Sequence, residues 1–374
     1  MQGFGVSRTV STVLTAALAL LLAGCPENPG NGNPDGGDGG SPDAGSPDAG
    51  TSPRYDVREL GTLGGATSEA TAINDLGQVV GTAEAADGGL RPFLWNPDGG
   101  GMIGLETPPC PGEARATAIN NHGRIAGYWY CTDGGYRAFS WENGQLMALP
   151  PLDGGGENST AYGINDLGQI VGTAVVPDNS HYRAAVVWSD GGVVLLAPAP
   201  TYHTDYTATG INENGEMVGW EYYTGSSFSS TAVLWKGGKL EVLPRPGTSQ
   251  SAISGPQEQA NAINDLGLIV GESVPSGGGT GSRAVIWENK QPRLLGGGRA
   301  FAINNAGLIV GAQKDRGTDR AQLWRDGGQL DLNELLPADG GWLLLRANGI
   351  NEAGQIVGAG MVGGQQRAFL LTPR

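Results

Sequence analysis

An eleven-residue pattern recurs along this chain and constrains its fold more than any other feature. The segment TAINDLGQVVG at 71–81 returns as TAINNHGRIAG at 117–127 and as NAINDLGLIVG at 261–271. Its Ile-Asn dipeptide occurs seven times, with the asparagine at positions 74, 120, 165, 212, 264, 304 and 351. Self-similarity at a period of roughly 40–50 residues indicates a repeat architecture in which each copy is one supersecondary unit.

Each copy predicts four short strands. The first strand ends in Ile-Asn after a small residue, and the second reads GQVVG or GQIVG. The third ends in an apolar residue, as in RPFLW and RAFLL, and the fourth alternates apolar and polar residues, as in GQLMALP. Short runs of this kind, bounded by glycine, are typical of small antiparallel sheets.

The segment INDLGQ between the first two strands predicts a tight turn. An asparagine side chain can bond the backbone two residues further on, and the glycine can take a positive φ at little cost. This pairing favours a type I turn with a glycine bulge. We therefore interpret the Asn-Asp pair as turn chemistry rather than as a ligand or metal site.

Seven four-stranded units predict an all-β fold, a seven-bladed β-propeller over residues 54–374. The last copy stops after RAFLLTP and lacks a fourth strand, whereas YDVRELG at 55–61 is a fourth strand without its first three. We expect strand 55–61 to join the last blade and close the ring, which removes an open sheet edge. The small residue near the end of each first strand suits the crowded neck of such a ring.

The first 24 residues predict an export signal. Arg8 precedes an apolar run at 13–23, which ends at Leu22-Ala23-Gly24-Cys25. This end resembles the lipobox of bacterial lipoproteins, so we expect a signal peptide at 1–24 and lipidation of Cys25; an ordinary secretory signal is the alternative. Because no Asp follows Cys25, we expect an outer-membrane lipid anchor facing the periplasm or the cell surface.

Residues 25–53 predict a tether, and the net charge of the chain limits which partners it can have. The segment 26–53 is rich in Pro, Gly and Asp and has almost nothing apolar to bury, which predicts a disordered tether after the lipidated Cys25. The net charge of −15 disfavours nucleic acid and anionic lipid surfaces as partners. We expect a monomer held at the membrane by its lipid.

The repeats resemble those of the HAF-repeat extracellular proteins. That family is named for a His-Ala-Phe in the third strand, and here the equivalents are Arg137-Ala138-Phe139 and Arg367-Ala368-Phe369, with Arg in place of His. The turn and second-strand motifs match over 55–374. The resemblance implies export and a repeat architecture, and it supplies no activity.

One face of the expected propeller carries the loops that vary. The turns between strands one and two and between strands three and four are short, whereas the other loops differ in length and lie on the opposite face. Function favours variable loops on a rigid frame. Aromatic residues gather there in blades two to four. Aromatic rings with a polar tip suit interfaces and sugar rings, so we interpret them as a candidate binding surface. Packing of these rings inside or between blades is the alternative. The candidate ligand-binding residues are Trp129, Tyr130, Tyr202, His203, Trp220, Tyr222 and Tyr223.

No known catalytic or cofactor motif emerges from the sequence. The chain has no G-x-S-x-G, H-E-x-x-H or C-x-x-C, and GAGMVG at 358–363 falls after a strand with no helix to follow. We expect no metal and no cofactor. Cys110 and Cys131 lie in loops of the same face and form a candidate disulfide, as an exported chain allows.

These observations favour a lipid-anchored, non-catalytic binding module of the cell envelope. Its expected partner is an envelope protein or a glycan, held by the variable face of blades two to four. One alternative is a polysaccharide hydrolase or lyase, because a carboxylate pair on that face could cleave sugars. The other is a purely structural envelope protein.

Overall fold

A computed structural model describes residues 55–106, 112–132, 134–155, 157–176, 182–196, 204–223, 225, 229–247, 257–275, 281–337 and 340–374. Within these ranges the chain forms 28 strands and one short 3-10 helix, η1 (Leu332–Leu335). The expected all-β class is confirmed. The predicted signal peptide, Cys25 and the tether lie outside the described residues. In the described part, no helix has the length and apolar character needed to cross a bilayer.

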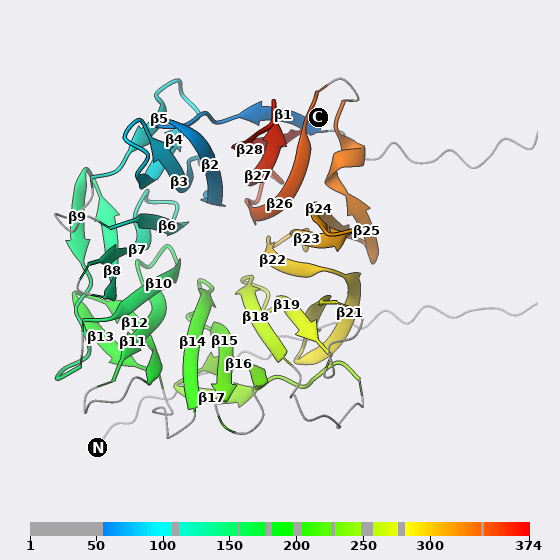
Figure 1. Cartoon of the computed structure of the whole chain (residues 1–374). Helices are drawn as coiled ribbons and strands as arrows, with labels where there is room; N and C mark the ends of the chain where they lie inside the picture. Colours follow the sequence, from blue (N-terminus) through cyan, green and yellow to red (C-terminus); the bar gives the residue numbers. More distant parts are fainter. Residues whose placement is uncertain are drawn as a thin grey trace, which may run out of the picture. The chain divides into compact units, whose positions relative to one another are not determined.

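The strands follow the sequence repeats in groups of four, which we number repeats 1 to 7 (Figure 1). Repeats 1 and 2 comprise β2 (Gly64–Ile73), β3 (Val79–Ala85), β4 (Leu90–Asn96) and β5 (Gly101–Gly104), then β6 (Ala114–Ile119), β7 (Ile125–Cys131), β8 (Gly135–Glu142) and β9 (Gln145–Ala148). Repeats 3 and 4 comprise β10 (Ser159–Ile164), β11 (Ile170–Val175), β12 (Arg183–Ser189) and β13 (Gly192–Leu195), then β14 (Thr204–Ile211), β15 (Met217–Tyr223), β16 (Ser229–Lys236) and β17 (Lys239–Val242).

The remaining strands continue this order. Repeats 5 and 6 comprise β18 (Gln257–Ile263), β19 (Ile269–Val274), β20 (Arg283–Glu288) and β21 (Gln291–Gly297), then β22 (Arg299–Ile303), β23 (Ile309–Asp315), β24 (Thr318–Arg325) and β25 (Gly328–Asp331). Repeat 7 comprises β26 (Leu343–Ile350), β27 (Ile356–Val362) and β28 (Gln365–Pro373), with β1 (Tyr55–Glu59) as its fourth strand.

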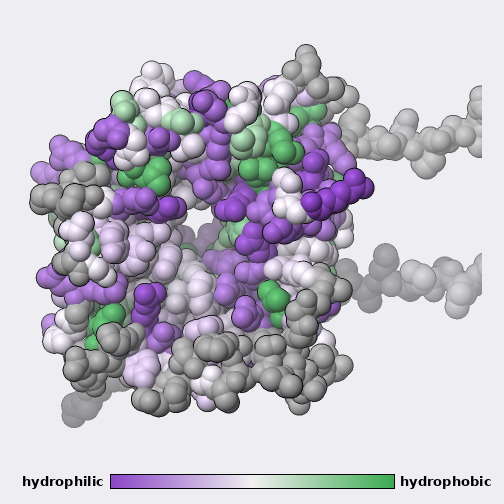
Figure 2. Space-filling view, viewed as in Figure 1, coloured by the Kyte–Doolittle hydropathy of each residue, from purple (hydrophilic) through white to green (hydrophobic). Residues whose placement is uncertain are grey.

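Each repeat is an antiparallel sheet, and the sheets stand around a central space (Figure 1). Strand β1 pairs with β28 from Tyr55 opposite Pro373 to Glu59 opposite Phe369, so the two ends of the described chain share one sheet. Repeats 4 and 5 are joined by a single parallel bridge between Ser230 and Gln257. Figure 2 shows that hydrophilic side chains border much of the central opening.

The glycine of the second strand is dictated by a bulge in the inner strand. In repeat 5 the pairing of β18 with β19 shifts between Ala260 and Ala262. The shift brings the inner backbone so close that a Cβ on Gly271 would lie 1.9 Å from the Gln259 carbonyl oxygen. Only glycine fits there without displacing the backbone, which explains why every repeat has Gly at this strand position.

The turn asparagine does more than shape its own turn. In repeat 5, Asn264 Oδ1 accepts hydrogen bonds from the backbone N–H groups of Leu266 (3.1 Å) and Leu268 (2.9 Å). Its Nδ2 donates to the carbonyl oxygen of Asn304 in the next repeat, at 3.0 Å. Gly267, at φ +77°, completes the expected turn with a positive φ. The asparagine therefore also links neighbouring repeats, a role that the sequence did not predict.

The same link occurs in all seven repeats and returns to its start. Each asparagine Nδ2 donates to the carbonyl oxygen of the asparagine in the following repeat at 3.0–3.2 Å. The final bond runs from Asn351 back to Asn74, at 3.0 Å. All seven side chains are buried. We call this set of seven bonds the asparagine ring.

The next turn residue builds a parallel set of links. Its backbone N–H donates to the side-chain oxygen at the same position of the following repeat, at 2.7–2.9 Å. The residues are Asp75, Asn121, Asp166, Glu213, Asp265, Asn305 and Glu352. An oxygen acceptor is all that the position requires, so Asp, Asn and Glu can all occupy it.

Hydrophobic cores lie between neighbouring repeats. One cluster joins Val80 and Leu94 of repeat 1 to Ala116, Ile119 and Ile125 of repeat 2. The crowding expected at the inner strands is also present, because a Cβ on Gly210 would lie 3.2 Å from the Cα of Ala262. Hydrophobic packing therefore joins neighbouring repeats, as in other repeat proteins.

Candidate binding site

Strand β7 in repeat 2 places aromatic side chains on both faces of its sheet. Successive side chains of a strand point to opposite faces, so Tyr128 and Tyr130 share one face whereas Trp129 and Cys131 share the other. Trp129 is 5% exposed, but Tyr130 is 38% exposed. The alternation thus divides the predicted aromatic cluster into a buried half and a surface half.

Trp129 belongs to the core rather than to a surface site. Its ring stacks on Phe139 at a centroid distance of 5.8 Å and an interplanar angle of 28°. Its Nε1 lies 3.1 Å from Cys131 Sγ, to which it donates a hydrogen bond. A ring held in this way is not available to a ligand, so we leave Trp129 out of the candidate site.

Three tyrosines of repeat 2 form a cluster in which Tyr130 and Tyr136 are exposed and Tyr128 is half-buried. Tyr136 on β8 meets the ring of Tyr128 edge-on at 5.5 Å and the ring of Tyr130 at 5.3 Å. Tyr130 and Tyr136 are direct partners across the β7–β8 pair. Such offset aromatic pairs stabilise one another by about 0.5–1.5 kcal/mol beyond burial, which holds the rings in place without a ligand.

The tyrosines line a hollow with a volume of about 480 Å³. Its lining residues are Gly112, Glu113, Arg115, Tyr128, Tyr130, Thr132 and Tyr136. We call it the tyrosine hollow. Arg115 and Glu113 form an exposed ion pair at 3.6 Å, so both charged groups remain reachable from solvent. A volume of this size is in the range of small-ligand sites.

Burial raises the pKa of the Tyr128 phenol, and the nearby Tyr162, Tyr136 and Glu113 add to this effect while Arg115 opposes it. The phenol therefore stays neutral at physiological pH. A neutral phenol can both donate and accept a hydrogen bond, which suits hydroxyl-rich ligands.

The other predicted site residues lie elsewhere. Trp220 and Tyr222 are half-buried on β15 in repeat 4, and Tyr223 at its end is 39% exposed. The predicted aromatics therefore form two groups on different repeats. Tyr202 and His203 lie outside the described residues.

The predicted disulfide also involves a position outside the described part of the chain. Cys110 falls there, whereas Cys131 is buried at the end of β7. The Cys110–Cys131 disulfide stays a prediction. Among the described residues, no three His, Cys, Asp or Glu side chains are grouped to hold a metal ion.

Tyr162 departs from the repeat pattern at one position of the inner strand. At the equivalent inner-strand position, Thr71, Thr117 and Thr209 each donate to a carbonyl oxygen of the following repeat at 2.7–3.0 Å. Repeat 3 has Tyr162 there instead, and its phenol is close enough to interact electrostatically with Tyr136. Comparing the copies position by position would have found this signal, as well as Phe301, the aromatic at the same position of repeat 6.

Comparison with known proteins supports the fold alone. No family model matches the chain, and no curated protein matches it. A solved prolyl endopeptidase is similar over 83% of this chain and 51% of its own, with 10% identity and a TM-score of 0.54. Acylaminoacyl peptidase from Pyrococcus horikoshii is similar at 11% identity over 84% of this chain and 53% of its own, with a TM-score of 0.49. TolB from Acinetobacter baumannii is similar at 12% identity over 79% of this chain and 63% of its own, with a TM-score of 0.43.

This chain spans about half to two thirds of the length of those proteins. At 10% identity the likeness to the prolyl endopeptidase concerns the fold alone. With the sheet topology described above, the chain has a β-propeller-like all-β fold.

Proposed function

We propose that this chain is a non-catalytic binding module that engages a glycan through the tyrosine hollow. The observation that carries the proposal is the cluster of Tyr128, Tyr130 and Tyr136 beside an exposed Arg115–Glu113 pair. Aromatic faces suit the apolar faces of sugar rings, and the phenols and charged groups suit the hydroxyls around them. A protein segment is the alternative partner for the same surface.

A closed seven-bladed propeller is the frame that we propose for this site. The pairing of β1 with β28 and the bond from Asn351 back to Asn74 support closure. Closure would fix the inner strands from both sides and leave no inner sheet edge exposed. The hollow would then lie on a rigid support, which lowers the entropic cost of binding.

The proposed location is the bacterial outer membrane, facing the periplasm or the cell surface. We propose cleavage after residue 24 and lipidation of Cys25, with 26–53 as a tether to a monomeric propeller. This arrangement rests on the sequence pattern around Leu22-Ala23-Gly24-Cys25. Stable anchoring requires more than one acyl chain.

A glycan and cell-wall polysaccharide array, probed with the purified full chain, tests the proposed function. We expect saturable binding to at least one glycan, and we expect the double change Tyr130→Ala with Tyr136→Ala to abolish it. Tyr223→Ala is the matched control, because Tyr223 is an equally exposed tyrosine on another repeat.

Three results would count against the proposal. Loss of binding in Tyr223→Ala alone would move the site to repeat 4. An empty array with a folded protein would favour a protein partner, to be sought by crosslinking in the envelope. Release of sugar fragments would favour the polysaccharide-cleaving alternative.

A further inference from the structure

A second hollow lies between repeats 5, 6 and 7, away from the tyrosine hollow. It has a volume of about 630 Å³ and is lined by charged and amide side chains, among them Glu272, Arg299, Gln313, Lys314, Asp319 and Arg346. An adjoining hollow of about 290 Å³ shares Lys314, Asp319 and Arg346 and reaches Glu69 of repeat 1. We call the two together the charged groove.

Two of the connections that border the charged groove are short. Strand β21 ends at Gly297 and β22 begins at Arg299, so Gly298 alone connects repeat 5 to repeat 6. Gly298 has φ +106°, and a Cβ there would lie 2.6 Å from the carbonyl oxygen of Ala312. The β23–β24 hairpin turns through just Arg316 and Gly317, both at positive φ. Each of these two connections is therefore a tight turn at the edge of the groove.

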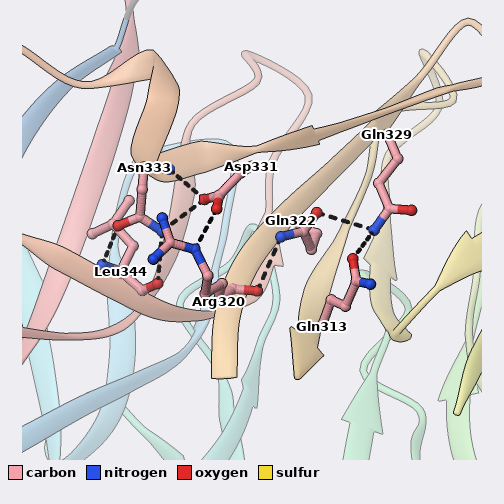
Figure 3. A network of polar contacts seen from close by, with 7 residues as sticks. All are labelled: Gln313, Arg320, Gln322, Gln329, Asp331, Asn333 and Leu344. Atoms are coloured by element: carbon pink, nitrogen blue, oxygen red, sulfur yellow. Dashed lines mark hydrogen bonds and ion pairs between the residues drawn. The ribbon is translucent and has the colours of Figure 1, made fainter. Parts of the chain in front are cut away.

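A network of amide side chains holds one wall of the groove (Figure 3). Gln329 Nε2 donates to Gln313 Oε1 at 2.6 Å and to Gln322 Oε1 at 3.0 Å. The same nitrogen lies 3.1 Å from the carbonyl oxygen of Gly297, which also lines the groove. Gln313 and the glycine connection are therefore positioned by bonds within the protein, before any ligand arrives.

Asp319 brings two arginines of different repeats together. Its Oδ2 lies 3.2 Å from Arg346 Nε and 3.6 Å from an Arg299 terminal nitrogen. A guanidinium group carries five N–H donors in a planar fork, so one contact leaves most of them available. Arg299 is further fixed over the ring of Phe301 at 5.3 Å. The two forks are thus oriented in advance toward the groove.

The carboxylates of the groove have hydrogen-bond or ion-pair partners within the protein, whereas the ammonium of Lys314 has none among the described residues. Asn348 Nδ2 donates to Glu69 at 3.0 Å, and Glu272 bonds Ser282. Burial raises the pKa of Glu272, so this carboxyl keeps its proton to a higher pH than an exposed glutamate does. Lys314 is exposed, and within the described part of the chain its ammonium has no hydrogen bond or ion pair.

The local sequence charge opposes that of the whole chain. Residues 283–326 contain eight Lys or Arg against four Asp or Glu, a net charge of +4 in a chain of −15. At physiological ionic strength, charges more than about 8 Å apart are largely screened. The charges that face a bound anion are therefore those lining the groove, where the donor groups of Arg299, Lys314 and Arg346 lie beside the carboxylates of Glu69, Glu272 and Asp319.

We infer that the charged groove binds the carboxylate or sulfate groups of an acidic glycan through Arg299, Lys314 and Arg346. Guanidinium forks match the two oxygens of such groups bidentately, and Lys314 adds a point charge. Gln313 offers a further amide beside them. The inference is independent of the tyrosine hollow, since it concerns other repeats and other residues.

Binding of the full chain to polygalacturonate, dextran sulfate and neutral dextran, measured by biolayer interferometry, tests this inference. We expect binding to at least one of the acidic polymers, none to neutral dextran, and weakening as salt increases. Preference between the two acidic polymers identifies carboxylate or sulfate as the recognised group. Free galacturonate and free sulfate show whether the polymer is needed.

Two matched pairs of variants locate the binding. Lys314→Gln should weaken binding roughly fivefold or more, whereas Lys239→Gln, which removes an exposed lysine on β17, should not change it. Arg346→Gln should weaken binding and Arg91→Gln should not, although the two arginines have similarly exposed side chains (48% and 45%). Tyr136→Ala should also leave it unchanged.

Equal binding of the acidic polymers by the two lysine variants would overturn the inference, as would binding to neutral dextran that Lys314→Gln weakens by the same factor. So would a failure of every acidic polymer to bind a folded chain. Lys314→Gln should remain folded, because an exposed side chain without an intramolecular bond contributes little to stability. A loss of binding in this variant therefore reports on the site and not on unfolding.

Discussion

Replacing Asn264 with alanine tests how strongly the asparagine ring stabilises this fold. The side chain is 5% exposed and makes three hydrogen bonds, two as acceptor within its own turn and one as donor to the next repeat. Alanine can form none of them. The change removes little apolar surface, so its effect reports the polar contacts almost alone.

The expected cost follows from the groups left without partners. The backbone N–H groups of Leu266 and Leu268 lose their acceptor, whereas the Asn304 carbonyl oxygen still accepts from Gly307 at 3.0 Å. A buried donor without a partner costs about 1–3 kcal/mol, and the more exposed Leu266 N–H costs less because water can reach it. We expect the free energy of unfolding to fall by about 2–4 kcal/mol.

Urea denaturation of the purified variant, followed by tryptophan fluorescence, measures this loss. Leu266→Ala is the matched control, because Leu266 lies in the same turn, is 70% exposed and should change stability by no more than about 0.5 kcal/mol. Asn264→Asp should also destabilise, since it keeps the acceptor but sets an oxygen against the Asn304 carbonyl. A loss below about 1 kcal/mol for Asn264→Ala would refute the reasoning.

Three further predictions concern backbone crowding, a buried carboxyl and the anchor. Gly271→Ala should destabilise severely because its Cβ would collide with backbone, while Gly192→Ala, whose Cβ would have no neighbour closer than 3.7 Å, should be nearly neutral by thermal unfolding. Burial raises the pKa of Glu258 above its usual 4.5, so its stabilising contribution is present below that pH and is lost as pH rises through the raised value. Glu258→Gln should therefore gain stability relative to the wild type as the pH rises above 4.5, and a difference in urea midpoint that does not change with pH would contradict this. Metabolic labelling with a fatty acid should modify the wild type in a bacterial host and not Cys25→Ala; equal labelling would exclude the proposed lipidation.

Much of the fold could be predicted from the sequence because the repeat is local. The strands and the turn glycine all depend on residues within a few positions of each other. The asparagine ring could not be predicted, because the donor and its acceptor are 40–52 residues apart in six of the bonds and 277 apart in the seventh. Nothing in INDLG indicates that the side chain also donates to the next repeat. The second-strand glycine was visible as a pattern, but its cause, the bulge in the inner strand, is three-dimensional.

The candidate site was predicted in part, and the difference follows from strand alternation. The segment YWYC was interpreted as one aromatic cluster, although alternate residues must face opposite sides of a strand. That rule separates buried Trp129 from exposed Tyr130. Arg115 was missed because it lies on a different strand from the aromatics. The charged groove was not predicted from the sequence, since its cations come from three strands of two repeats that only the fold brings together.

Isothermal titration calorimetry of the full chain with the strongest neutral glycan from the array tests the proposed binding function most directly. A non-catalytic tyrosine hollow predicts a saturable isotherm with about one site per chain and a return to baseline after each injection. The Tyr130→Ala and Tyr136→Ala double variant should give no binding heat. An unchanged isotherm in that variant would show that the ligand binds elsewhere, and heat that continues after each injection would show turnover; either result would contradict the account.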